Sequence, residues 1–139
     1  MNTVDSSASG ECAINAEGDI VMVRKLVRNV ASELGFGITD VTRIVTAASE
    51  LSRNVYQYAG KGNMRWRALR DDHRAGIELC FEDQGPGIAD IPQAMEAGYT
   101  TGGGLGLGLP GTKRLMDEMT LESHPGQGTN VTIRKWHTL

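Results

Sequence analysis

Apolar residues recur at steps of three and four in two stretches of the first half of the chain. Steps of this size place side chains on one face of an α-helix, so each stretch predicts an amphipathic helix. The first helix begins near Asp19 and ends before Gly35, and its apolar face is Ile20, Val23, Val27, Val30 and Leu34. The second begins near Thr39, which can cap a helix, and ends at Gly60-Lys61-Gly62. Its apolar face is Ile44, Ala48, Leu51, Val55 and Tyr58.

Strand-like stretches account for much of the remaining chain. In the clearest one, residues 76–82, Ile77, Leu79 and Phe81 alternate with polar positions, as in a strand with one buried face. Further strands are predicted at 11–15, 63–69, 120–123 and 129–136, with a hairpin connection at 70–75, and short helices at 90–97 and 110–118. Because hairpins and helices both occur, we expect an α+β sandwich, a mixed and mostly antiparallel sheet with helices on one face.

Length, charge and cysteine content narrow the class of protein. The 139 residues fit one domain, and we expect a flexible tail at residues 1–10 followed by a single domain at 11–139. No apolar run reaches the roughly 20 residues of a membrane helix, and the first ten residues do not resemble a signal peptide, so we expect a cytoplasmic protein with no membrane contact. The net charge of −3 argues against nucleic acid as a partner. Cys12 and Cys80 are expected to be free, partly buried thiols.

The second predicted helix carries a carboxylate and an amide one turn apart, Glu50 and Asn54. At about 100° per residue they lie at the edge of the buried face, where a polar group can border a cavity. There, Glu50 can accept a proton from an attacking hydroxyl, and Asn54 can offer its carbonyl oxygen to Mg²⁺. On spacing alone, the solvated flank of a surface helix is the more common explanation.

A second motif, Asp83-Gln-Gly-Pro-Gly87, follows directly after the clearest predicted strand. Gly85 and Gly87 allow backbone conformations that other residues resist, and Pro86 stiffens the turn. A carboxylate at Asp83 can accept the 6-amino hydrogens of adenine, which guanine lacks. An ordinary Asp/Gly/Pro turn explains the motif equally well in isolation.

Glycines cluster most densely between Gly98 and Gly111, in a chain with 18 glycines among 139 residues. Successive backbone N–H groups in such a loop, followed by a helix N-terminus, form a cradle for phosphates. Residues 106–111 read GxGxxG but do not follow a strand, so they do not indicate a dinucleotide fold. Walker A and eukaryotic-type kinase motifs do not occur in the chain. The alternative is a flexible linker.

The order of the three motifs resembles that of the GHKL superfamily, whose nucleotide site combines an N-box helix, a DxGxG loop and a glycine-rich turn. The resemblance extends over residues 11–136 and implies ATP and Mg²⁺ as cofactors, with Glu50 as the catalytic residue and Asn54 as the metal ligand. The residues that it assigns to the nucleotide are Asn54, Asp83, Gly85, Gly87, Thr101, Gly102, Gly103, Gly104, Leu105, Gly106, Leu107, Gly108 and Thr129.

Within this superfamily, the chain looks like the switch-protein and anti-sigma serine/threonine kinases of stress and sigma-factor regulation. Residues 28–37, 56–62, 82–88 and 103–117 carry this closer likeness. It implies a serine or threonine of a STAS-domain protein as the phosphate acceptor. Phosphorylation would then free the kinase to activate a PP2C-type phosphatase.

Alternatives from other classes differ in what they require. A histidine kinase needs a dimerisation helix with a phosphoacceptor histidine, whereas His73, His124 and His137 are expected to be surface or turn residues. A gyrase- or chaperone-type ATPase needs a transducer domain after the nucleotide site. A nucleotide-responsive binding module that transfers little or no phosphate has no chemical need for Glu50 and Asn54. Arg24 and Arg28 either dock a protein partner or form a solvated helix face.

Overall fold

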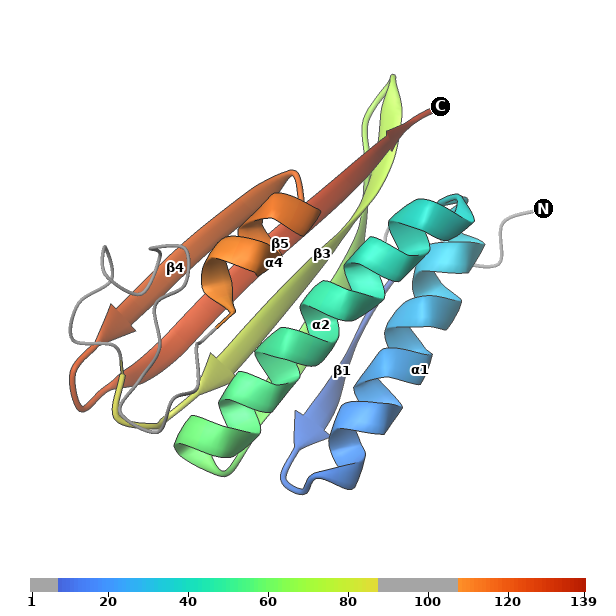
Figure 1. Cartoon of the computed structure of the whole chain (residues 1–139). Helices are drawn as coiled ribbons and strands as arrows, with labels where there is room; N and C mark the ends of the chain where they lie inside the picture. Colours follow the sequence, from blue (N-terminus) through green and yellow to red (C-terminus); the bar gives the residue numbers. More distant parts are fainter. Residues whose placement is uncertain (1–7, 88–107) are drawn as a thin grey trace.

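A five-stranded antiparallel sheet with helices on one face makes up the part of the chain described in this computed structural model, residues 8–87 and 108–139 (Figure 1). In chain order the elements are β1 (Ser9–Ile14), α1 (Gly18–Glu33), α2 (Ile38–Ala59), β2 (Gly62–Arg70), β3 (Arg74–Asp83), α4 (Leu109–Leu115), β4 (Glu118–His124) and β5 (Gly128–Thr138). The strand order is β1-β2-β3-β5-β4. The expected α+β fold is therefore confirmed. All four strand pairings are antiparallel, so the described strands contain no parallel pair of the kind that a mixed sheet would have.

The core lies between the helices and the inner face of the sheet. The apolar faces of α1 and α2 pack against alternate residues of the central strands, among them Ile77, Leu79 and Phe81 of β3, which are at most 1% exposed. The intervening positions of β3 point to the open face of the sheet and are polar or small. The period of two in this strand therefore predicted its buried side correctly.

Helix ends differ from the sequence predictions in two places. Helix α2 begins at Ile38 with Gly37 as its N-cap and no side-chain cap, so the prediction that Thr39 caps it is wrong. Its C-terminus is as expected, because Gly60 takes the left-handed conformation (φ 80°) that favours glycine. Helix α4 ends at Leu115, and Glu118 already belongs to β4, so the helix expected at 110–118 is shorter than predicted. The helix expected at 90–97 lies outside the described residues.

The first strand begins at Ser9, so Ser9 and Gly10 belong to the sheet and not to a tail. Gly10 lies opposite Trp66, where a Cβ would approach the indole Nε1 to 2.7 Å. Glycine at this position lets the large indole lie beneath the edge strand. No helix in the described ranges has the length and hydropathy that a bilayer crossing requires.

The histidines and cysteines have different surroundings. His73 and His124 are exposed, as expected, but His137 is partly buried in β5. Its Nε2 lies 2.8 Å from the carbonyl oxygen of Leu34, and its ring packs edge-on against Phe36. The expectation of a surface or turn residue is therefore wrong for His137, which connects the last strand to the turn after α1. Cys12 and Cys80 are both free and partly buried, as predicted.

Candidate functional site

The middle of α2 places Glu50 and Asn54 at the border between buried and exposed surface, as the helical spacing predicted. Both residues are partly exposed, and the side chain of Glu50 is 35% exposed. Arg53, one turn further along the same helix, donates a hydrogen bond from Nη1 to Glu50 Oε1 at 2.9 Å. The arginine therefore holds one carboxylate oxygen of Glu50.

Gly108 brings the end of the glycine-rich segment against Glu50. It is the N-cap of α4 and has φ of +69°, in the left-handed region. A Cβ on Gly108 would lie 2.6 Å from both Cγ and Oε2 of Glu50. Glycine is thus required here twice, once by the backbone conformation and once by the contact with the carboxylate. The structure joins the first and third sequence motifs at this contact.

Asp83 ends β3 with its carboxylate half-buried on the same side of the sheet as the helices. Its Oδ1 accepts a hydrogen bond from the backbone N–H of Gly85 at 2.9 Å. Burial raises the pKa of Asp83 above its ordinary value, and hydrogen bonds from the backbone of Gly85 and of Thr129 oppose this rise. Asp83 and Thr129 are also direct partners in the β3–β5 ladder. Asp83 and Thr129, both assigned to the nucleotide by the resemblance, therefore lie side by side.

The loop after Asp83 is packed too tightly for side chains at its glycines. A Cβ on Gly85 would lie 2.8 Å from the Cβ of Ala59 at the end of α2. Gly87 has φ of +77°, and a Cβ there would collide with the carbonyl oxygen of His124. The loop is thus held between α2 and the β4–β5 turn, and both of its glycines are required by this packing.

Ser123 contributes to this region, although the sequence motifs did not indicate it. Its hydroxyl lies 2.8 Å from the hydroxyl of Thr129 and donates to the carbonyl oxygen of Gly128 at 3.1 Å. Ser123 and Thr129 face each other across the β4–β5 hairpin. Their opposition follows from the strand register, which none of the sequence motifs specified.

The contacts of the predicted site residues form two groups in the described part of the chain. Gly108 lies against Glu50, which is on the same helix as Asn54, and Asp83 lies beside Gly85 and Thr129. Gly87 adjoins the second group and packs against the β4–β5 turn. The predicted nucleotide contacts from Thr101 to Leu107 lie outside the described residues. Within residues 8–87 and 108–139, no three His, Cys, Asp or Glu side chains form a metal-binding cluster. Asn54, which the sequence resemblance assigns to Mg²⁺, could offer the ion its amide oxygen, a ligand type that suits it.

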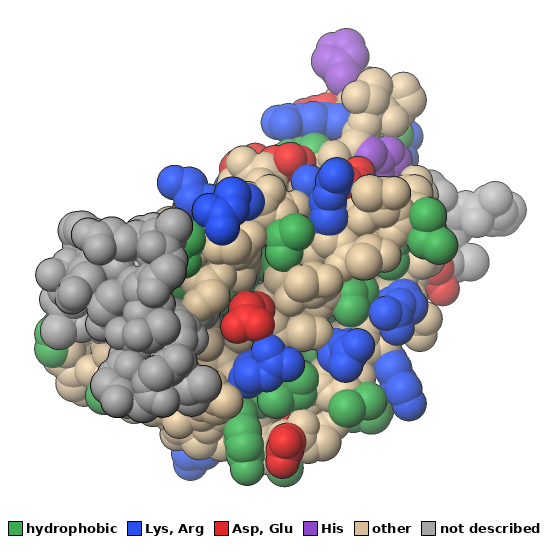
Figure 2. Space-filling model, viewed as in Figure 1, with side chains coloured by type: hydrophobic (Ala, Val, Ile, Leu, Met, Phe, Trp, Pro, Cys, Tyr) green, Lys and Arg blue, Asp and Glu red, His purple; other side chains and the backbone are tan. Residues whose placement is uncertain are grey.

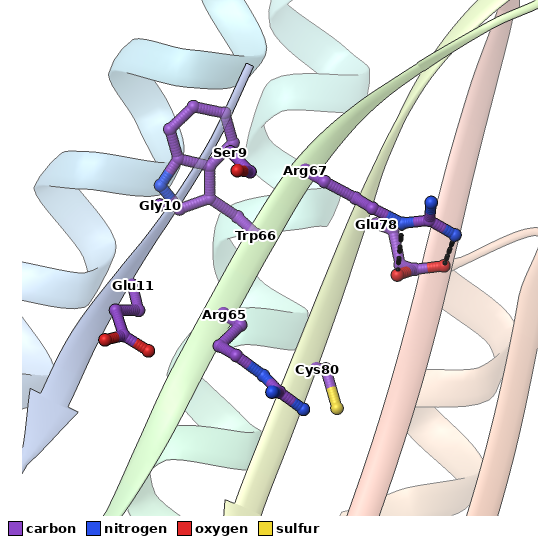
Figure 3. A pocket seen from close by; sticks show the side chains of 8 residues that line it. All are labelled: Ser9, Gly10, Glu11, Arg65, Trp66, Arg67, Glu78 and Cys80. Carbon is purple, nitrogen blue, oxygen red and sulfur yellow. Dashed lines mark hydrogen bonds and ion pairs between the residues drawn. The ribbon is translucent and has the colours of Figure 1, made fainter. Parts of the chain in front are cut away.

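A hollow of about 380 Å³ on the open face of the sheet does not belong to this site (Figure 3). Its charged side chains neutralise one another, because Arg67 donates two hydrogen bonds to the carboxylate of Glu78, at 2.8 and 3.1 Å. Arg134 donates a third to the same carboxylate at 2.7 Å. These residues alternate along the strands with the core residues and so face away from Glu50. The hollow therefore has neither the position nor the free charge of a nucleotide site.

Comparison with known proteins identifies the family. Residues 39–138 match the family of histidine kinase-, DNA gyrase B-, and HSP90-like ATPases. The chain belongs to this family. The fold agrees, since the catalytic domain of the histidine kinase ThkA superposes with a TM-score of 0.54, at 16% identity, over 91% of this chain and 97% of that domain. Membership implies that the domain binds ATP.

Two curated relatives are similar over most of their length. The serine/threonine-protein kinase RsbT of Bacillus subtilis is 55% identical over 123 residues, which are 88% of this chain and 92% of RsbT. The anti-sigma F factor of Caldanaerobacter subterraneus is 34% identical over 119 residues, 81% of this chain and 82% of that protein. These similarities confirm the resemblance to the switch-protein and anti-sigma kinases within the superfamily.

Proposed function

We propose that this chain is a serine/threonine-protein kinase that transfers the γ-phosphate of ATP to a hydroxyl of a STAS-domain protein. The contact between Gly108 and the carboxylate of Glu50 carries this proposal, because it brings a candidate general base to the end of the glycine-rich segment. The 55% identity to a protein named as a serine/threonine kinase supports the same reaction.

The chemistry needs a base and a place for the nucleotide. The hydroxyl oxygen of the acceptor attacks the γ-phosphorus, the bond to the β-phosphate oxygen breaks, ADP leaves, and Glu50 takes the hydroxyl proton. The hydrogen bond from Arg53 occupies Oε1 of Glu50, so Oε2, beside Gly108, is the oxygen placed to take this proton. Asn54 would hold Mg²⁺ through its carbonyl oxygen, and the ion would supply positive charge to the phosphates.

Adenine selection is assigned to Asp83 and Thr129 at the ends of β3 and β5. The carboxylate of Asp83 accepts from the 6-amino group, which guanine does not have. A hydrogen bond to a charged group contributes about 1.5–3 kcal/mol, so ATP should bind at least about tenfold more tightly than GTP. Equal affinities in a competition titration would remove Asp83 from this role.

The partner docks on the helix-covered side of the molecule, where Lys and Arg side chains gather over α1, α2 and α4 (Figure 2). Arg24, Lys25 and Arg28 are exposed on α1, and Lys113 and Arg114 are exposed on α4. Glu50 lies on α2, and its carboxylate is accessible. An acceptor protein with an acidic surface could contact both basic groups while presenting its hydroxyl to Glu50.

Phosphorylation is proposed to release the partner. The new phosphate carries a charge of about −1.5 to −2 and lies beside Glu50 and the phosphates of ADP. Arg53 is paired with Glu50 and offsets the charge of that carboxylate, so the phosphates of ADP are the main source of the added repulsion. Release then leaves the kinase free to bind and activate a PP2C-type phosphatase. Unchanged or tighter binding of the phosphorylated STAS protein would contradict this switch, even with the kinase activity established.

The proposal is tested with Glu50→Gln in a phosphotransfer assay against a panel of STAS-domain proteins. We expect ATP affinity close to that of the wild type and phosphotransfer lower by about 10²–10⁴-fold, the usual contribution of a general base. Glu33→Gln, which changes an exposed acid at the end of α1, is the matched control and should transfer phosphate normally. Wild-type turnover by Glu50→Gln would show that Glu50 is not the base.

A further inference from the structure

Lys135 is a buried lysine on the inner face of β5 that no part of the proposed mechanism uses. The residue is 8% exposed, and its Nζ donates to the carbonyl oxygen of Leu115 at 3.0 Å. The same nitrogen lies 3.4 Å from Oδ1 of Asp117 and 3.9 Å from Oδ1 of Asp40. A buried ammonium needs such acceptors, and these three come from the end of α4, the segment after it and the first turn of α2.

Helix α4 depends on contacts with the rest of the protein for its position. It has seven residues, too few to be stable on its own. The last carbonyl groups of a helix have no partner within it and form the negative end of its dipole. Lys135 supplies both a donor and a positive charge at that end, through its bond to the last residue, Leu115.

The opposite end of α4 is Gly108, which lies against Glu50. Helix α4 is about 10 Å long at 1.5 Å per residue, so it is short enough to move as one unit. Helix α2, which carries Glu50, begins with the turn that holds Asp40. Lys135 thus contacts both helices whose relative position determines the distance from Gly108 to Glu50.

We propose that Lys135 is a positioning residue for the ATP site, fixing α4 against β5 and α2 so that Gly108 meets Glu50. This inference rests on the proposed role of that contact in nucleotide binding and phosphotransfer. The polar contacts of Lys135 in the described part of the chain are with Leu115, Asp117 and Asp40, none of which is assigned to ATP, so its effect passes through α4.

The surrounding hydrogen bonds confine the effect of losing Lys135 to α4. Asp117 would keep its bond from the backbone N–H of Trp136 at 2.8 Å, through Oδ2. Asp40 would keep its ion pair with Arg43, at 3.0 Å. The carbonyl of Leu115 would lose the lysine donor, so the C-terminal end of α4 is where the structure should loosen.

The test compares Lys135→Met with Lys135→Arg, which restores the charge and the donors. Amide hydrogen exchange of residues 109–116, relative to that of α2, should rise by about tenfold in Lys135→Met, and the Kd for ATP should rise by a similar factor. Lys135→Arg should bring both close to the wild type. Val27→Ala, a cavity variant in the core of α1, controls for general destabilisation and should leave the α4-to-α2 exchange ratio unchanged.

Lys135→Gln keeps N–H donors and most of the volume, and it replaces Lys135→Met in the test if that variant does not fold. We expect both its α4 amide exchange and its Kd for ATP to lie between those of the wild type and those of a protein in which Lys135 makes no contact with α4. Wild-type ATP affinity in the folded variants, or faster exchange of α4 only in proportion to the loss of global stability, would overturn the proposal. Neither readout requires phosphotransfer, so a wild-type protein that fails to phosphorylate STAS proteins would refute the proposed function without deciding this one.

Discussion

Replacing Gly108 with alanine tests the contact on which the site depends. The new Cβ would lie 2.6 Å from Cγ and Oε2 of Glu50, well inside van der Waals contact, and the backbone is in the left-handed region with φ of +69°. Two separate consequences follow. One is strain in the main chain, and the other is displacement of the carboxylate.

The two consequences differ in size and in where they are measured. A left-handed conformation costs a non-glycine residue about 1–2 kcal/mol, which for a chain of this length lowers Tm by roughly 3–8 °C. The carboxylate of Glu50 is the end of a flexible side chain, so it can turn away and add little to this loss of stability. Displacing it by about 1 Å, however, can lower the rate by roughly 10²-fold. We therefore expect Gly108→Ala to lower phosphotransfer far more than it lowers stability.

The assay measures Tm, the Kd for ATP and the phosphotransfer rate for Gly108→Ala and for Gly111→Ala. Gly111 lies in the same helix, and none of the residues that the structure describes lies within 4 Å of its added Cβ, so Gly111→Ala should keep full activity and lose no stability. In a Glu50→Ala background, Gly108→Ala should cause no further loss of rate, because the displaced group is already gone. A normal rate in Gly108→Ala, or a loss that adds fully to that of Glu50→Ala, would refute the reasoning.

Three further predictions concern the rest of the fold. The pKa of Asp83 is raised in the folded, ATP-free protein, so protonation of this carboxyl adds to the free energy of unfolding. This contribution is complete at a pH below the ordinary pKa and is lost as the pH rises through the raised pKa. ATP affinity should accordingly fall as the pH drops through that raised pKa, and Asp83→Asn should remove this pH dependence in a titration series. Hydrogen bonds from Arg67 lower the pKa of Glu78, so the stability that the ionised Glu78 contributes is lost as the pH falls through the lowered pKa. Glu78→Gln should lower the free energy of unfolding by about 1 kcal/mol in urea and leave ATP affinity unchanged. The buried hydroxyl of Ser52 has no hydrogen-bond partner among the described residues, so Ser52→Ala should keep or raise the unfolding free energy by up to about 1 kcal/mol, and a clear loss would contradict this.

The sequence alone determined those features that depend on local periodicity and backbone freedom. The steps of three and four gave the buried faces of α1 and α2, and the alternation in β3 gave its inner side, because burial acts on every residue of an element in the same way. Gly60 marked the end of α2 because its left-handed conformation is a local requirement. The three motifs were recognisable for the same reason, since each is a short run with its own conformational demands. Helix starts were less well predicted, as Gly37 in place of Thr39 shows, because a helix can begin without a side-chain cap.

Only the tertiary structure decided which of these local features meet. Three contacts join residues from different elements. Gly108 lies against Glu50, Ser123 faces Thr129, and the buried Lys135 bonds to Leu115. No periodicity within one element encodes such a pairing, because it depends on strand register and on how a short helix packs against a long one. A lysine in a strand and a histidine near the end of a chain ordinarily indicate surface positions. Lys135 and His137 are buried or partly buried here because helix and turn carbonyl groups lie above β5 and accept their hydrogen bonds.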